Sequence, residues 1–213
     1  TFHAKGEESS TVATWLVDAG YRTALFGKYL NGYPDGGPSS SYIPPRWTEW
    51  MSPVAGTPYK GFNYTMNHNG EMEVYGKADA DYLTDVISNA AVDFIRRSVD
   101  QHPDKPFFIY LAPYAPHAPA IPAPRHENTF KDLKVPRGPS FNEADVSDKP
   151  NWVSTLPLLT PTEIADMDKL YRKRRQSLLA VDEMVENVIK TLRTTGELRN
   201  TYVIFTSDNG YHQ

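Results

Sequence analysis

The chain has 213 residues, with 22 basic and 26 acidic side chains and a formal net charge of −4. This balance argues against a nucleic-acid-binding surface built on bulk positive charge. Apolar residues make up 39% of the sequence, enough for a packed core, so wholesale disorder is excluded. Because cysteine is absent, disulfides, thiolate metal sites and a cysteine nucleophile are excluded within these residues. No apolar run reaches the roughly 18 residues that a membrane-spanning helix needs.

The first predicted elements are a short helix and a strand. Serine and threonine at positions 9–11 are favoured N-caps for a helix that Gly20 closes. The apolar residues of 22–26 then predict a short buried strand. Residues 33–60 are rich in proline, glycine and serine, and so predict a long loop. Long loops in compact domains are more often functional than accidental.

The middle of the chain predicts a hairpin, a helix and a strand. Asn69-Gly70 favours a two-residue turn, so 62–68 and 71–75 are expected to pair as a β-hairpin. Residues 79–99 carry apolar side chains at helical spacing, which predicts an amphipathic helix. The continuous apolar run 107–111 is typical of a central parallel strand.

The last part of the chain predicts a loop, a long helix and a strand. A second proline-rich loop is expected over 112–159. Residues 160–163, Thr-Pro-Thr-Glu, form a capping box with proline at the first helical position, and open a helix that runs to Thr195. An apolar strand is expected over 201–206. The order of elements predicts an α/β fold with a mainly parallel sheet flanked by helices.

Polar segments follow three of the expected strands, at Lys28, His117 and Asp208. Ligands of open parallel sheets bind beyond the carboxyl ends of the strands, so these segments are expected to converge on one site. A lysine and a histidine there would hold an anion, with the histidine also a general acid. The alternatives are a surface lysine in a turn and a loop histidine packed on tyrosine or proline. Prolines on both sides of His117 are expected to keep its backbone extended, and His212 is a weaker candidate of the same type.

A metal site is suggested by Asp208 and Asn209. Their carboxylate and amide oxygens are ligands that hard cations such as Ca²⁺ or Mg²⁺ prefer. The alternative is an ordinary turn, because the sequence Asp-Asn-Gly is strong turn chemistry. Two ligands do not complete a calcium shell of ~6–8 oxygens, so a metal here needs further ligands from elsewhere.

Taken together, several motifs resemble the sulfatase family of the alkaline-phosphatase-like superfamily. Each motif alone is weak, but their order, spacing and strand-end placement match over nearly the whole chain. Other segments indicate one branch of this family, because they resemble N-acetylglucosamine-6-sulfatases and the extracellular heparan endosulfatases. The family motifs are 19–23 with 27–32, 115–119 and 207–212, and the branch motifs are 27–31, 41–45 with Trp47, and 195–198 with 200–202.

The resemblance implies a sulfuric ester hydrolase that uses a formylglycine nucleophile and a metal ion, calcium rather than magnesium. The implied substrate is a sulfated sugar, with 6-O-sulfated N-acetylglucosamine of a glycosaminoglycan as the best match. By match to the motifs, Lys28 and His117 bind the sulfate, and His117 also assists the leaving oxygen. Asp208 and Asn209 ligate the metal, and His212 is a further substrate-binding candidate. A secreted, periplasmic or lysosomal location is implied as well.

Two departures from the family pattern bear on these expectations. Many sulfatases have a histidine two positions after the lysine, where this chain has Leu30, as its branch does. The Cys/Ser-x-Pro-x-Arg nucleophile motif is absent from these residues. We therefore expect residues 1–213 to be an internal part of one sulfatase catalytic domain, incomplete at both ends and inactive in isolation. The alternatives are a phosphodiesterase or phosphonate hydrolase of the same superfamily, and a non-catalytic carbohydrate-binding homologue.

Overall fold

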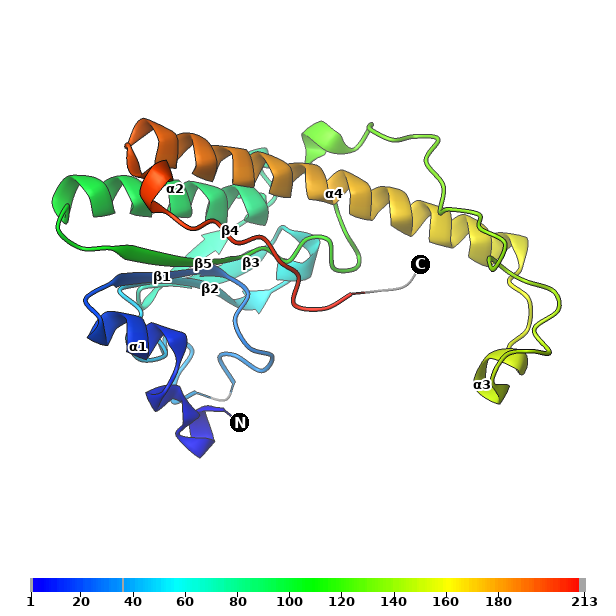
Figure 1. Ribbon diagram of the computed structural model, residues 1–213, viewed down its shortest axis with the longest axis horizontal. Coiled ribbons are helices and arrows are strands. Elements are labelled where there is room, and N and C mark those ends of the chain that lie inside the picture. Colours follow the sequence, from blue (N-terminus) through cyan, green and yellow to red (C-terminus); the bar gives the residue numbers. More distant parts are fainter. Residues whose placement is uncertain (1, 36, 211–213) are drawn as a thin grey trace.

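The computed structural model describes residues 2–35 and 37–210 and contains a five-stranded sheet with helices on both faces (Figure 1). Helix α1 covers one face, α2 covers the other, and α4 packs on the outside of α2. The α/β class predicted from the sequence is confirmed. The strands are β1 Arg22–Gly27, β2 Glu49–Gly56, β3 Tyr64–His68, β4 Glu71–Tyr75 and β5 Phe107–Ala112, and the helices are α1 Val12–Asp18, α2 Leu83–Gln101, α3 Asn151–Ser154 and α4 Pro161–Thr194.

The sheet is mixed, with the strand order β4-β3-β2-β1-β5. Strand β1 pairs in parallel with both β2 and β5. Strands β2 and β3, and likewise β3 and β4, pair antiparallel, and β3 and β4 form the hairpin that Asn69-Gly70 predicts. The mainly parallel arrangement therefore holds for β2, β1 and β5, and their carboxyl ends lie at one edge of the sheet.

The predicted long loop over 33–60 is wrong in its second half, because it contains strand β2. Pro53 and Gly56 make this segment look like loop sequence, since both residues are rare inside strands. The strand accommodates them with a shift of register against β3 between Pro53 and Ala55. Burial decides the conformation here, because Trp50 is 0% and Met51 is 3% exposed.

Two apolar segments differ from their predicted roles. Strand β5 is present, but among the described residues it forms an edge of the sheet rather than its centre. Residues 201–206 form no strand, and Tyr202 and Ile204 are 98% and 83% exposed. An apolar, β-branched pattern favours a strand only where a neighbouring strand supplies hydrogen bonds and a face to cover. No described strand pairs with residues 201–206.

The two long helices follow the sequence pattern. Helix α2 buries Leu83, Ile87, Ala91 and Phe94 against the sheet, as its helical spacing predicts. Helix α4 begins with the predicted capping box, in which the Thr160 backbone N–H donates to Glu163 Oε2 at 2.7 Å. None of the helices described here has both the length and the apolar character needed to span a membrane.

A charged cluster at the amino-terminal edge of β1 and β2 makes stability depend on pH. His68 lies 2.8 Å from Glu73 and 3.9 Å from Glu49, and Arg97 donates to both carboxylate oxygens of Glu49 at 2.7 Å. Interaction with Glu49, reinforced by Glu73, raises the pKa of His68 above its ordinary value. A raised pKa in the folded state means that protonated His68 stabilises the fold.

We expect His68→Gln to destabilise the protein at pH values below about 6.5, the ordinary histidine pKa. The stability that protonated His68 contributes is complete there, and it is lost as the pH rises through the raised folded pKa. Thermal unfolding of both proteins from pH 5.5 to 9 measures the difference. A difference in melting temperature that stays constant or grows toward pH 9 would contradict this assignment.

Candidate active site

Lys28 is positioned by a close approach of β1 and β5. Gly27 has φ +111°, and a Cβ at this residue would lie 2.1 Å from the Ala112 carbonyl oxygen, so only glycine fits. The Lys28 N–H donates to the same Ala112 oxygen at 2.8 Å. The last residues of the two strands are therefore joined, and the segments that follow them start side by side.

His117 lies in the segment after β5, where two turns meet. Its N–H donates to the Tyr114 oxygen, and the Ala120 N–H donates to the His117 oxygen, both at 2.9 Å. The predicted extended backbone is therefore wrong, because prolines at 116 and 119 occupy turn positions that these hydrogen bonds close. The His117 Nδ1–H donates to the Ala118 carbonyl oxygen at 2.8 Å. Since a carbonyl only accepts, Nδ1 carries a proton and Nε2 is the nitrogen left for a ligand.

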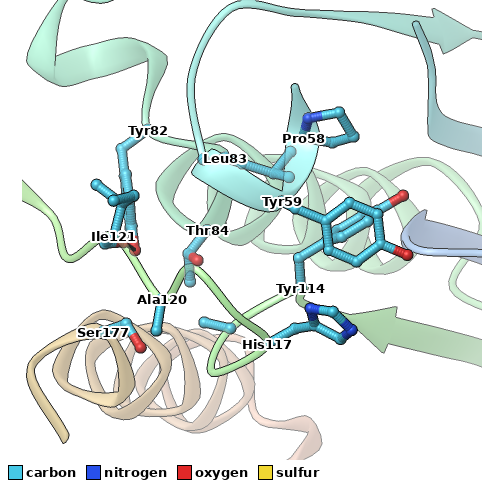
Figure 2. A pocket seen from close by; sticks show the side chains of 12 residues that line it. Pro58, Tyr59, Tyr82, Leu83, Thr84, Tyr114, His117, Ala120, Ile121 and Ser177 are labelled. Atoms are coloured by element: carbon cyan, nitrogen blue, oxygen red, sulfur yellow. Dashed lines mark hydrogen bonds between the residues drawn. The ribbon is translucent and has the colours of Figure 1, made fainter. Parts of the chain in front are cut away.

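Tyr59 connects the lysine and the histidine. The Lys28 Nζ lies 5.7 Å from the centre of the Tyr59 ring, within reach of a cation–π contact. The His117 ring lies 4.6 Å and the Tyr114 ring 4.8 Å from the same centre. Figure 2 shows Tyr59, Tyr114 and His117 next to one another. Of the three segments predicted to converge, those of Lys28 and His117 therefore do so, because both approach Tyr59. The third segment, at Asp208, makes its hydrogen bonds within 207–209 and has no described contact with this cluster.

The side of this cluster that faces α4 is packed. The space lined by Tyr59, Tyr114, His117 and Ser177 measures about 10 Å³ (Figure 2). This is close to the volume of a single water probe, so no ligand enters there. A cleft of about 290 Å³ lies on the other side, lined by Lys28, Tyr59 and Tyr114 together with residues that follow β1 and the end of β2. A ligand therefore approaches Lys28 and Tyr59 from this cleft.

Polar contacts hold the His117 segment to the long helices. The Tyr82 hydroxyl donates to the Ile121 oxygen at 2.9 Å. Arg125 donates through Nη1 and Nη2 to the two carboxylate oxygens of Asp85 at 2.7 and 2.8 Å, and through Nε to Glu183 at 2.9 Å. These contacts tie the loop to both α2 and α4, so a long proline-rich segment presents His117 from a fixed base.

Arg125→Ala is expected to loosen the loop that carries His117. The pair is bidentate but partly exposed, so we expect a local cost of about 1–2 kcal/mol. A cost of this size raises the open population roughly five- to thirtyfold. Limited proteolysis within 113–159 measures it, and Arg96→Ala, whose pair with Asp93 lies on an exposed helix face, is the control. Equal cleavage of the two variants would contradict the assigned role.

Asp208 and Asn209 are exposed near the end of the described chain. The Asn209 N–H donates to Asp208 Oδ1 at 2.9 Å, and the Ser207 hydroxyl donates to the Asn209 oxygen at 2.6 Å. Their contacts are those of a turn. No group of three or more His, Asp or Glu side chains suited to a metal occurs within 2–35 and 37–210. The metal site stays a prediction, and His212 lies outside the described residues.

One residue at this site, Tyr59, was not predicted as functional. It lies in the 3₁₀ turn Pro58–Lys60, within the segment expected to be loop. Nothing in the local sequence distinguishes Tyr59 from the other tyrosines. Its position depends on the pairing of β2 with β1 and β3, which carries the turn to the edge where Lys28 and His117 lie.

Comparison with known proteins identifies the family to which this chain belongs. The chain belongs to the sulfatase family, whose sequence profile, described as Sulfatase, matches residues 2–213. The extracellular sulfatase SULF-1 homolog of Drosophila melanogaster is 38% identical over 206 residues, which are 96% of this chain and 18% of the relative. The N-acetylglucosamine-6-sulfatase of Homo sapiens is 38% identical over 198 residues, 91% of this chain and 34% of the relative. The chain thus spans about a third of the length of one of these relatives and less than a fifth of the other.

A solved structure supports the fold. A protein whose structure is known in complex with its substrate D-glucosamine-2-N,6-O-disulfate superposes with a TM-score of 0.59 at 20% sequence identity. The match covers 93% of this chain and 51% of that protein. At this identity the likeness establishes the fold, and so agrees with the mixed sheet and its flanking helices.

Proposed function

We propose that the protein to which these residues belong hydrolyses sulfate esters of a sugar. The observation that carries the proposal is the meeting of Lys28 and His117 at Tyr59, at the carboxyl ends of β1 and β5 in a sulfatase-family chain. Lys28 and Tyr59 line the open cleft, and His117 packs against the Tyr59 ring, so an ammonium with an imidazole nearby suits an oxyanion. The family relationship favours sulfate over phosphate as that oxyanion.

In this proposal Lys28 and His117 have different roles in the reaction. The Lys28 ammonium neutralises negative charge on the sulfate oxygens. This includes the negative charge that develops on the bridging oxygen as its bond to sulfur breaks. His117, with Nδ1–H held by the Ala118 oxygen, presents Nε2 to the substrate. When protonated, Nε2 donates its proton to the departing sugar oxygen, so that the sugar leaves as a neutral alcohol. Tyr59 contacts both side chains and so keeps the ammonium and the imidazole at one place.

A metal ion and a formylglycine complete the proposed site. Asp208 and Asn209 have the oxygen donors that Ca²⁺ prefers, but two residues supply fewer ligands than a calcium ion takes. They fit as part of a site whose other ligands come from elsewhere in the protein. A bound Ca²⁺ would neutralise charge on the sulfate. The formylglycine is proposed to lie outside residues 1–213, which contain no cysteine and no Ser-x-Pro-x-Arg segment. The isolated residues 1–213 would then be inactive.

The proposed substrate is 6-O-sulfated N-acetylglucosamine in a glycosaminoglycan. It rests on the relatives named N-acetylglucosamine-6-sulfatase and extracellular sulfatase, and the second name favours a secreted location among the secreted, periplasmic and lysosomal locations that the family resemblance implies. The test is release of inorganic sulfate from 6-O-sulfated N-acetylglucosamine oligosaccharides by the full-length protein, with and without a calcium chelator. We expect release that the chelator lowers. Binding of the oligosaccharide without release would favour the non-catalytic alternative.

A further inference from the structure

The segment that carries Lys28 is anchored to the sheet further along the chain, at Tyr33. The Tyr33 hydroxyl donates to the Tyr42 carbonyl oxygen at 2.7 Å. It also accepts hydrogen bonds from Trp50 Nε1–H at 2.9 Å and from Asn67 Nδ2–H at 3.0 Å. A tyrosine hydroxyl has one proton to donate and accepts through its oxygen, so this group uses its full hydrogen-bonding capacity. One side-chain atom thus joins the segment after β1 to β2, to β3 and to the backbone at Tyr42.

The two groups that donate to Tyr33 are themselves fixed. Trp50 in β2 and Asn67 in β3 are both 0% exposed. Asn67 Nδ2–H also donates to the Tyr42 oxygen at 3.1 Å, and Asn67 Oδ1 accepts from the Gly70 N–H at 2.8 Å. Burial raises the pKa of Tyr33 above its ordinary value, so the hydroxyl keeps the proton that it donates. A buried network whose members are all paired rigidifies the elements that it joins.

Aromatic contacts connect this anchor to the residue next to Lys28. The Tyr29 ring lies 5.7 Å from the Tyr33 ring and 5.0 Å from the Trp50 ring, edge-on in both cases. On its other side Lys28 is held by its own N–H, which donates to the Ala112 oxygen at 2.8 Å. The Lys28 backbone is therefore held from both directions, and the position of its ammonium at the cleft depends on both.

We propose that Tyr33 is a positioning residue for Lys28, and that its hydroxyl fixes where the Lys28 ammonium lies in the cleft. The proposal rests on the proposed sulfatase function, because it takes Lys28 as the group that acts on the sulfate. Tyr33 is not a catalytic residue, since its hydroxyl is fully used within the protein. A shift of about 1 Å in a group that acts on a substrate is enough to lower a rate substantially, so loss of this anchor changes the rate from a distance.

Tyr33→Phe in the full-length protein tests this, because it removes the hydroxyl and keeps the ring that Tyr29 contacts. We expect kcat/KM to fall about five- to thirtyfold on a sulfated sugar and on an aryl sulfate alike, since Lys28 acts on the sulfate that both share. In a Lys28→Ala background the same substitution should change kcat/KM by less than twofold, because no ammonium is left to position. The melting temperature should fall by the same amount in both backgrounds, which separates the loss of activity from the loss of stability.

The matched control is Thr23→Val, which removes another buried hydroxyl from the segment of β1. Thr23 is 0% exposed and lies at the opposite end of this strand from Lys28. Its hydroxyl donates to the Arg46 oxygen at 2.6 Å and accepts from the Thr48 N–H at 3.1 Å. The variant should lower the melting temperature and leave kcat/KM within twofold of the wild type.

Binding of inorganic sulfate to the full-length protein, measured by calorimetry, is a second test that needs no turnover. We expect the Kd to rise about five- to thirtyfold in Tyr33→Phe and to stay within twofold in Thr23→Val. An unchanged Kd, or an equal loss of kcat/KM with and without Lys28, would overturn the positioning role. A wild-type protein that binds sulfate but hydrolyses neither ester would remove the proposed function instead, and the binding series would still test the position of Lys28.

A milder variant serves if Tyr33→Phe does not fold. Tyr42→Phe removes the hydroxyl that donates to Glu8, and so loosens the backbone carbonyl to which Tyr33 donates. We expect the same pattern with a smaller loss, about two- to fivefold in kcat/KM, confined to proteins that contain Lys28. The same loss in the Lys28→Ala background would contradict the proposal.

Discussion

His117→Ala is expected to lower kcat of the full-length protein on a sulfated sugar by about 10²–10⁴-fold, the usual contribution of a general acid. A sugar alkoxide is a poor leaving group, so loss of the proton from Nε2 should be felt mainly in the chemical step. The same variant should lose much less activity on an aryl sulfate, whose phenolate leaves without protonation. Comparison of the two ratios measures the acid role separately from sulfate binding.

The control for this variant is His102→Ala. His102 follows α2 at the other end of β5 and lies away from the cluster of Lys28, Tyr59 and His117. It should leave both rates within twofold of the wild type. A His117→Ala protein that loses the same factor on both substrates would show that the imidazole only binds sulfate, and a protein with no loss would remove His117 from the site.

Lys28→Ala should lower kcat/KM by about 10²–10³-fold on both kinds of sulfate ester, the usual cost of removing one preorganised group that stabilises a developing oxyanion. The loss should not depend on the leaving group, because the ammonium acts on the sulfate oxygens common to both substrates. Lys28→Arg keeps the charge but changes its shape and reach, so it should recover only part of the activity.

The control here is Lys105→Ala. Lys105 is an exposed lysine just before the amino-terminal end of β5, whereas Lys28 follows the carboxyl end of the neighbouring β1. Its substitution should change kcat/KM by less than twofold. A Lys28→Ala protein with an unchanged melting temperature and wild-type kcat/KM would show that Lys28 is an ordinary surface lysine. That was the alternative left open by its local sequence.

The convergence of Lys28 and His117 was predictable because it depends on two apolar strand sequences and on the rule that parallel strands have their carboxyl ends on the same side of the sheet. The segments that became β1 and β5 were recognisable from their apolar runs. Adjacent parallel strands end at the same edge, so the residues after them had to lie close together. The helices were predictable for a similar reason, since the apolar spacing of α2 and the capping box at Thr160 are local signals.

The remaining features depend on contacts between distant parts of the chain. Strand β2 contains Pro53, and only the burial of Trp50 and Met51 reveals it as a strand. Tyr59 reaches the site because β2 and β3 carry its turn there. Residues 201–206 show the reverse case, in which a strand-like sequence has no paired neighbour among the described residues.

A double-mutant cycle on kcat/KM of the full-length protein, with Lys28→Ala, His117→Ala and the double variant, tests most directly whether Lys28 and His117 hold one sulfate. Groups that act on the same ligand are coupled, typically by about 0.5–3 kcal/mol, whereas independent sites add within about 0.5 kcal/mol. We predict that the double variant loses at least about tenfold less than the product of the single losses, which corresponds to about 1.4 kcal/mol of coupling. Losses that multiply to within a factor of two would contradict a shared sulfate site.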